Sequence, residues 1–209
     1  MLALVVADAP HADLHEFLPL FSVADLVIAA DGGTRHVLHY GITPHVIIGD
    51  LDSVDLQTLA IMQERGVEIV RYSAQKDETD LELAVLLAIE RGATEIRILA
   101  ALGGRPDMHL ANHLLLAHHG LHACHIAMLD HGWEIRMIHT LLRLQGNLGQ
   151  RVSLLPLGDV EGISTTGLRY ALHDESLLGD AVRGVSNEFA ATNAEIHVRS
   201  GQLLIFIER

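Results

Sequence analysis

Two aspartates that follow an apolar run have a spacing that suits a metal ion. Residues 45–48 form the run, and Gly49, Asp50, Leu51 and Asp52 come directly after it. Because alternate residues of an extended segment point the same way, Asp50 and Asp52 can aim their carboxylates at one point. Mg²⁺ in proteins prefers oxygen ligands of this kind. The spacing therefore predicts a magnesium site at the end of a strand.

A second polar segment, Lys76-Asp-Glu-Thr-Asp80, lies about one strand and one helix further along the chain. Lys76 is the only lysine, and thirteen arginines supply the remaining fixed positive charge. An ammonium group that stands among carboxylates suits an anionic ligand bound through a metal. The segment therefore adds a positive charge, that of Lys76, to the predicted metal site.

The first two thirds of the chain alternate strand and helix patterns that can position these residues. Short apolar or β-branched runs predict buried strands at residues 2–7, 25–30, 45–48, 67–72, 95–101 and 122–129. Apolar residues at spacings of three and four predict helices at residues 34–40, 55–65, 80–91 and 107–119, with Gly66, Gly92 and Gly120 as C-terminal caps. This alternation predicts an α/β fold with a mostly parallel, doubly wound sheet and helices on both faces.

The last third changes to short runs separated by turn residues. Strands are predicted at residues 134–139, 141–144, 151–156, 161–165, 168–171, 185–189, 194–199 and 203–207. Such a series is typical of an antiparallel β-sandwich. The change of pattern predicts two domains, at residues 1–131 and 132–209.

Four polar clusters are expected at one edge of the predicted sheet, because ligands of such sheets bind at the carboxyl ends of the strands. They comprise residues 30–33, 49–53, 75–80 and 102–107. Gly32 and Gly33 would let backbone N–H groups approach phosphate oxygens. Each of these clusters alone has a simpler explanation, with Asp31, Asp77 or Asp80 as a helix cap and Arg105 as a surface arginine. The coincidence of four such loops favours one shared site.

The composition excludes several partners. A net charge of −13 repels a nucleic-acid backbone, so no nucleic acid is expected to bind. The apolar runs are well short of the roughly 18 residues that span a bilayer, so no membrane partner is expected. No basic residue precedes the first apolar run, as one would in a secretory signal, which predicts a cytoplasmic protein. A single cysteine, Cys124, excludes internal disulfides.

Other phosphate and metal motifs fit the chain less well. Neither the P-loop nor the three-glycine dinucleotide motif occurs. Asp50 and Asp52 resemble the aspartates of haloacid dehalogenase-type phosphatases, but those enzymes need a later lysine and a further acidic pair. His109 and His113 stand four residues apart without the glutamate of a zinc protease, so we expect them to be exposed residues of a helix.

Five motifs, in this order and spacing, resemble those of the thiamin pyrophosphokinase family. They are Asp31-Gly-Gly, Ile48-Gly-Asp-Leu-Asp-Ser53, Lys76-Asp-Glu-Thr-Asp80, Leu102-Gly-Gly-Arg-Pro-Asp107 and Leu110-Ala-Asn112. Residues 152–156, 166–172 and 184–188 resemble segments of its β-sandwich. The resemblance implies transfer of a pyrophosphoryl group from ATP to the hydroxyl of thiamin, which gives thiamin diphosphate and AMP. It also implies Mg²⁺, a homodimer, and a second domain that contributes to the thiamin site and the dimer interface.

This chemistry assigns a role to each residue. Mg²⁺ is predicted to bind Asp50, Asp52 and Asp80, with Asp31 as a fourth acidic contributor; Arg105 completes the predicted catalytic set. ATP is predicted to contact Gly32, Gly33, Lys76, Asp77, Thr79, Arg105 and Asn112. Thiamin is predicted to contact Asp107 and, by the resemblance, Ser186 and Asn187 across the dimer interface. One of the carboxylates can instead accept the hydroxyl proton, and the sequence does not say which.

Two alternatives stay open. The same apparatus could transfer pyrophosphate to another hydroxymethyl heterocycle, such as a pterin, or the chain could be a nucleotide-sensing module without catalysis. One departure from the family also concerns the ligand: Met108 stands where members usually carry His or Gln. His109 follows, but one residue turns a helix side chain by about 100°, so it is no simple replacement.

Overall fold

The computed structural model of the chain describes residues 1–121 and 124–209. The chain folds into two compact units, Met1–Asp130 and His131–Arg209. Among the described residues, no helix is both long and apolar enough to cross a membrane.

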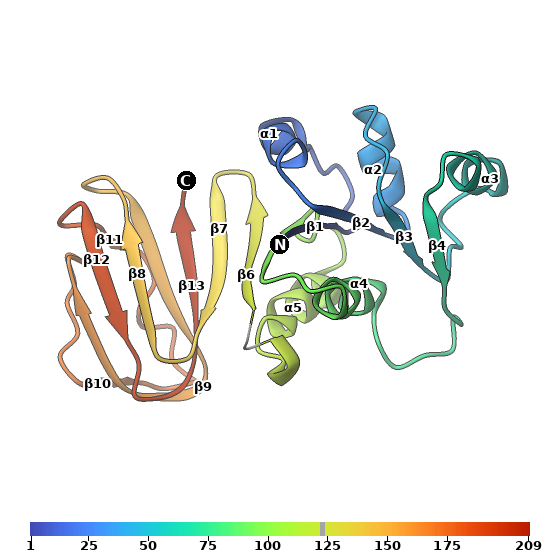
Figure 1. The fold of residues 1–209 in the computed structure, drawn as a ribbon. Coiled ribbons are helices and arrows are strands. Elements are labelled where there is room, and N and C mark those ends of the chain that lie inside the picture. The colour runs from blue at the N-terminus through green and yellow to red at the C-terminus, as the bar shows by residue number, and fades with distance from the viewer. Residues whose placement is uncertain (122–123) are drawn as a thin grey trace. The chain divides into compact units, whose positions relative to one another are not determined.

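The first unit contains a parallel sheet in the order β4-β3-β2-β1-β5-β6 (Figure 1). Its strands are β1 (Leu2–Val6), β2 (Leu26–Ala30), β3 (Val46–Gly49), β4 (Glu68–Arg71), β5 (Glu95–Leu99) and β6 (His125–Asp130). All neighbouring pairs in this part of the sheet are parallel, which confirms the predicted arrangement. Residues 122–123, with which the last predicted strand began, lie outside the described residues.

The strand order has a consequence for ligand binding. From β1 the chain adds β2, β3 and β4 on one side, and then returns to place β5 on the other side of β1. Loops therefore leave the carboxyl ends of β1 and β5 in opposite directions, and an open sheet forms its ligand crevice at such a point. The topology predicts a site where residues 7–10 and residues 100–103 meet.

Helices cover both faces of this sheet (Figure 1). They are α1 (Leu18–Phe21), α2 (Gly33–His39), α3 (Leu56–Glu64), α4 (Asp80–Glu90) and α5 (Pro106–Leu115), with short 3₁₀ turns at η1 (His15–Phe17) and η2 (His119–Leu121). Asp55 and Thr79 cap α3 and α4, because their side chains accept hydrogen bonds from Thr58 N and Glu82 N. Burial on both faces explains why β2 and β3 are apolar at every position except the final glycine of β3.

Two of the three glycine caps are confirmed and one is wrong. Gly66 (φ 82°) and Gly92 (φ 89°) follow α3 and α4 in the left-handed region. Gly120 lies instead within η2, because α5 ends at Leu115, earlier than the predicted end at residue 119. Apolar residues continue past that end, so their spacing alone did not mark it.

The second unit is an antiparallel β-sandwich. Its strands are β7 (Trp133–Ile138), β8 (Leu141–Gln145), β9 (Arg151–Thr166), β10 (Glu175–Leu177), β11 (Asn187–Glu188), β12 (Asn193–His197) and β13 (Ser200–Glu208). The long β9 pairs with β13 along most of its length and with β12 at its C-terminal end, so it belongs to both sheets. Buried residues of both sheets, among them Leu154, Ile196 and Leu203, form one apolar cluster.

The predicted strands of this unit need three corrections. Residues 151–156 and 161–165 belong to a single strand, β9, since Gly158 and Gly162 let it bend without ending. Residues 168–171 form no strand; Leu168 makes only an isolated bridge with Phe189. The short β10 was not predicted, because three residues give too little alternation to recognise.

Candidate active site

The carboxyl ends of β1 and β5 enclose a pocket of about 340 Å³, at the point that the strand order indicates. Its apolar lining includes Ala7, Ala9, Pro10, Leu81, Ala100, Ala101 and Met108, and its polar lining includes Asp8, Asp31, Thr79, Asp80, Arg105 and Asn112. Three of the four predicted loops thus contribute to it, those after β2, β4 and β5. An apolar pocket with a few convergent polar groups is typical of a small-molecule site.

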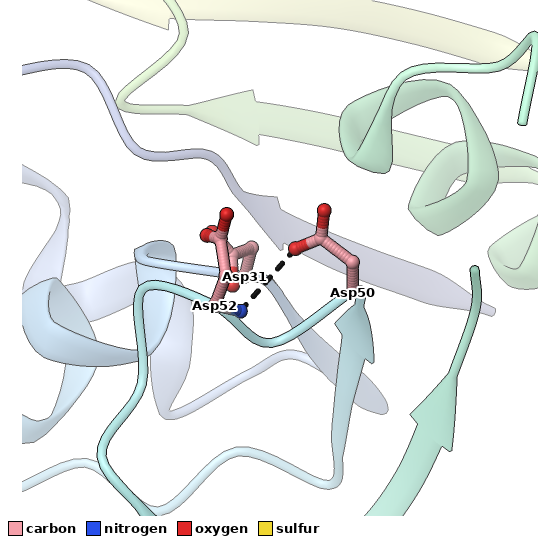
Figure 2. Close-up of side chains that lie close together, drawn as sticks. All are labelled: Asp31, Asp50 and Asp52. Carbon is pink, nitrogen blue, oxygen red and sulfur yellow. Dashed lines mark hydrogen bonds between the residues drawn. The ribbon is translucent and has the colours of Figure 1, made fainter. Parts of the chain in front are cut away.

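The acidic cluster of Asp31, Asp50 and Asp52 lies at the same edge. Each residue offers an oxygen within 4.8 Å of the others (Figure 2). Asp31 is 8% exposed and Asp52 faces solvent, so the cluster runs from the interior to the surface. In the part of the chain that the structure describes, no ion pair within 4.0 Å involves these three carboxylates, although Asp31 and Arg35 interact electrostatically. Three carboxylates this close together form a site that favours a cation.

The backbone turns sharply to bring these carboxylates together. β3 ends at Gly49, and Leu51, between the two aspartates, has a left-handed φ of 65° and a buried side chain. Asp50 and Asp52 therefore converge through a turn and not through strand alternation, from which their convergence was predicted. Asp31 is left-handed too, at φ 43°. Strained residues of this kind gather at functional sites, where the surrounding structure holds them.

Gly49 packs against Asp80 and also against Asp31 of this cluster. A Cβ on Gly49 would lie 2.9 Å from Asp80 Oδ1 and 3.1 Å from the Cβ of Asp31. Asp80 therefore packs beside the acidic cluster without being one of its three members. Its Oδ1 instead accepts a hydrogen bond of 2.7 Å from Lys76 Nζ, whose side chain is only 12% exposed. Of the predicted metal ligands, Asp50 and Asp52 are thus grouped with Asp31, and Asp80 is grouped with Lys76.

The other residues of the 76–80 segment have separate surroundings. Thr79 lines the pocket and also caps α4, accepting a hydrogen bond of 3.1 Å from Glu82 N. Asp77 is exposed. Thr79, and not Asp80, is therefore the cap of α4, and this role of Thr79 is compatible with its predicted contact with ATP.

Gly32 and Gly33 are required by packing. A Cβ on Gly33 would lie 2.1 Å from the carbonyl oxygen of Val6, and one on Gly32 would lie 2.1 Å from Asp8 Oδ2. α2 begins after Gly32 with no side-chain cap, so the carboxylate of Asp31 is not used as a helix cap. The simpler explanation of Asp31 as a cap is wrong.

Arg105 and Asp107 contact each other. Arg105 Nη2 and Nε donate to the two oxygens of Asp107 at 2.6 and 3.1 Å, and both side chains are mostly exposed. The Arg105 hydrogen bonds, followed by one from the Met108 backbone, lower the pKa of Asp107 to about 2. Arg105 lines the pocket, as Asn112 does, whose Nδ2 donates to the Ala101 carbonyl at 2.7 Å. Asn112 therefore ties α5 to the end of β5.

The prediction that His109 and His113 are exposed is wrong. His113 is buried, and its Nδ1 bonds the carbonyl of His109 at 2.7 Å. Burial lowers the pKa of His113, so the neutral form is favoured. His109 Nδ1 accepts a hydrogen bond from Gly103 N at 3.1 Å and thus supports the 102–107 loop. The two imidazoles stack on one face of α5, with their ring centroids 4.9 Å apart.

Ser186 and Asn187 lie in the second unit. Ser186 is exposed and left-handed at φ 59°. Asn187 is buried, and its amide bonds the backbone N–H and C=O of Tyr170 at 2.9 Å each. The side chain of Asn187 therefore connects β11 to the loop that carries Tyr170.

Asp8 and Arg35 belong to the site and were not singled out in the sequence. Asp8 follows β1 and lines the pocket, and Arg35 Nη2 donates to both of its oxygens, at 2.9 and 2.8 Å. The position of Asp8 directly after the first strand was the available signal, since the same rule selected the other four loops.

Comparison with known proteins gives matches along almost the whole chain. The family model described as "Thiamin pyrophosphokinase, catalytic domain" matches residues 17–128, and that described as "Thiamin pyrophosphokinase, vitamin B1 binding domain" matches residues 138–203. The Thiamine pyrophosphokinase of Bacillus subtilis is 27% identical over 204 residues, which cover 96% of this chain and 95% of that protein. Thiamine pyrophosphokinase 1 of Oryza sativa subsp. japonica is 29% identical over 202 residues, covering 83% and 76%.

Solved structures agree with this match. The crystal structure of the Bacillus subtilis thiamine pyrophosphokinase superposes with a TM-score of 0.86 at 25% identity, covering 100% of this chain and 99% of that one. The Candida albicans thiamin pyrophosphokinase gives a TM-score of 0.85 at 16% identity, covering 99% and 89%, and supports the fold alone.

A doubly wound α/β unit with an acidic cluster after β2 and β3, followed by an antiparallel sandwich, agrees with the family match, which places this protein among the enzymes that transfer a pyrophosphoryl group from ATP. The chain belongs to the thiamin pyrophosphokinase family, whose catalytic model alone matches more than half of it. It transfers a pyrophosphoryl group from ATP to the hydroxyl of thiamin, which gives thiamin diphosphate and AMP. The alternatives of a pterin acceptor and of a non-catalytic sensor are not favoured.

Proposed function

We propose that the acidic cluster binds the Mg²⁺ that accompanies ATP. The observation that carries this proposal is the grouping of Asp31, Asp50 and Asp52, each of which offers an oxygen within 4.8 Å of the others. Their donor atoms are all carboxylate oxygens, which fit a hard divalent cation. When bound, Mg²⁺ would neutralise charge on the phosphate oxygens as the pyrophosphoryl group is transferred.

Other residues of the chain are assigned to positioning the substrates. Among the cations of the site, we assign Lys76 and Arg105 to phosphate oxygens. Lys76 also bonds Asp80, which leaves Asp80 beside the acidic cluster as a further ligand once the lysine turns to the phosphates. Gly32, Gly33, Asp77, Thr79 and Asn112 complete the proposed ATP contacts. The attacking oxygen of thiamin displaces AMP from the β-phosphorus, and a carboxylate of the site takes up its proton.

The acceptor end of the reaction involves fewer groups. We assign Asp107 to the cationic or amino-bearing part of thiamin, since its lowered pKa keeps it ionised at neutral pH. Ser186 and Asn187 are proposed to contribute from the second unit, which the family model associates with vitamin B1 binding. We further propose a cytoplasmic homodimer, and sedimentation velocity at micromolar protein concentration would reveal the dimer or a monomer.

Incubation with ATP, Mg²⁺ and thiamin tests the reaction. We expect AMP to form only when thiamin is present, and in equal amount to thiamin diphosphate. AMP formed with a hydroxymethyl pterin instead would favour the other acceptor, and ADP or free phosphate would indicate a different transfer. Direct titration with Mn²⁺ tests the metal role, since Asp52→Asn should bind it more weakly than the wild type does.

A further inference from the structure

Asp8 has its carboxylate fixed by groups from α2, although it follows β1. Arg35 Nη2 donates to Oδ1 at 2.9 Å and to Oδ2 at 2.8 Å. On the same side, His36 Nε2 lies 3.5 Å from Oδ1. The charge of Asp8 is therefore matched within the protein, and Asp8 is not a member of the acidic cluster.

The same carboxylate packs directly on the turn that carries Asp31. All three atoms of the Asp8 carboxyl group, Cγ, Oδ1 and Oδ2, would lie between 2.1 and 2.6 Å from a Cβ on Gly32. No residue larger than glycine fits there without a shift, and Gly32 is bonded to Asp31 in the chain. Arg35 N donates to the Gly32 carbonyl at 3.0 Å, so the residue that holds Asp8 also closes this turn.

Asp31 needs such support because of its backbone. Its φ of 43° lies in the left-handed region, which residues other than glycine rarely adopt. On the side of β3 its N–H donates to the Ile48 carbonyl at 2.8 Å. On the opposite side the turn contacts Asp8. The conformation of Asp31 is thus held between β3 and the Asp8–Arg35 pair.

We infer that Asp8, clamped by Arg35, is a positioning residue that fixes the Asp31–Gly33 turn and so aims the Asp31 carboxylate into the acidic cluster. This inference rests on the proposed role of that cluster in binding Mg²⁺. Groups that orient metal ligands without touching the metal typically contribute about 10- to 100-fold to metal affinity or activity. The Asp8–Arg35 pair is positioned to contribute to metal affinity in this way.

Mn²⁺ binding without nucleotide, measured by isothermal titration calorimetry, tests the inference. Asp8→Asn and Arg35→Ala should each weaken binding about tenfold or more. The double variant should lose little more than either single variant, because both changes open the same clamp. Turnover of the single variants should recover when Mg²⁺ is raised about tenfold, whereas loss through unfolding would not respond to the metal.

Arg91 and Glu68 provide a matched control in the same unit. Their ion pair of 2.7 Å is similarly exposed, at 43% and 45%, and lies away from the acidic cluster. Glu68→Gln and Arg91→Ala should therefore bind Mn²⁺ as the wild type does. Weaker binding in this pair would overturn the inference, since it would show that loss of any ion pair suffices.

Asp31→Asn distinguishes the inference from the function on which it rests. If Asp31→Asn leaves Mn²⁺ affinity unchanged, the proposed metal role of the cluster fails, and the role of Asp8 fails with it. If Asp31→Asn weakens binding but Asp8→Asn and Arg35→Ala bind as the wild type does, the inference alone is overturned. Arg35 is 63% exposed, so Arg35→Ala keeps this outcome accessible even if Asp8→Asn folds poorly.

Discussion

Gly49→Ala is a substitution whose effect on the acidic side chains can be worked out from the structure. Gly49 ends β3 with φ 146°, a backbone conformation that is strained for any residue with a Cβ. The added methyl group would lie 2.9 Å from Asp80 Oδ1 and 3.1 Å from the Cβ of Asp31. It would therefore press on two of the acidic side chains of the site at once.

Neither Asp80 nor Asp31 can move away from the added methyl group without disturbing a hydrogen bond that holds it. Asp80 Oδ1 is held by Lys76 Nζ at 2.7 Å, and Asp31 is anchored by its own N–H to the Ile48 carbonyl at 2.8 Å. The backbone strain alone costs about 1–3 kcal/mol of folding free energy. Relief of the contacts moves the carboxylates, and a misplacement of about 1 Å in an active site can lower the rate about 100-fold. We expect both effects in the same variant.

Gly66→Ala separates the two effects. Gly66 is also left-handed, at φ 82°, but nothing lies within 4 Å of its missing Cβ and it follows α3 away from the site. It should lose about 1–2 kcal/mol of stability in urea unfolding and keep its kcat/KM for AMP formation. Gly49→Ala should lose stability and about 100-fold in kcat/KM. Equal kcat/KM values for the two variants would refute the crowding effect.

Three further predictions concern other parts of the protein. Asp52→Asn should lower kcat about 100-fold or more with an unchanged circular dichroism spectrum, and wild-type turnover would remove Asp52 from the catalytic set. Arg105→Ala should weaken ATP binding or turnover, and NMR titration should show the pKa of Asp107 rising from about 2 toward its ordinary 3.8. Because the pKa of Asp107 is lowered in the folded state, this pair stabilises the protein above pH 3.8, and the contribution fades as the pH falls toward 2. Unchanged kinetics of Arg105→Ala would show that Arg105 is only a surface ion-pair partner. Asn187→Ala should lower the free energy of unfolding by about 1–3 kcal/mol, since the buried Asn187 amide makes two hydrogen bonds with the Tyr170 backbone and both are lost. An unchanged urea midpoint would contradict that role.

The sequence predicted the first unit well because its strands and helices are locally determined. Runs such as β2 are buried on both faces and carry only apolar residues, and Asp55 and Thr79 stand at the starts of helices as caps. The sandwich was predicted as a class, but β9 was divided into two strands. Its glycines suggested turns, and only pairing with β13 and β12 keeps the chain extended through them.

The candidate site shows the same division. The sequence by itself determined which loops carry carboxylates, because each follows an apolar strand and the carboxyl ends of parallel strands share one edge. It could not decide how these carboxylates are grouped. Asp31, and not Asp80, joins Asp50 and Asp52, because left-handed turns at Asp31 and Leu51 redirect the chain and Lys76 bonds Asp80.

Asp8 shows what tertiary structure alone decides. In the sequence it is one aspartate after a strand, far from Gly32 and Arg35. The parallel pairing of β1 with β2 brings the loops after them together, so that this carboxylate lies on Gly32 and between the side chains of α2. Residue types and their order along the chain thus specify the strands, the edge of the sheet where the ligand binds, and the chemical groups at that edge. Contacts between residues distant in sequence specify which groups meet. They hold the backbone turns that set the direction of each side chain.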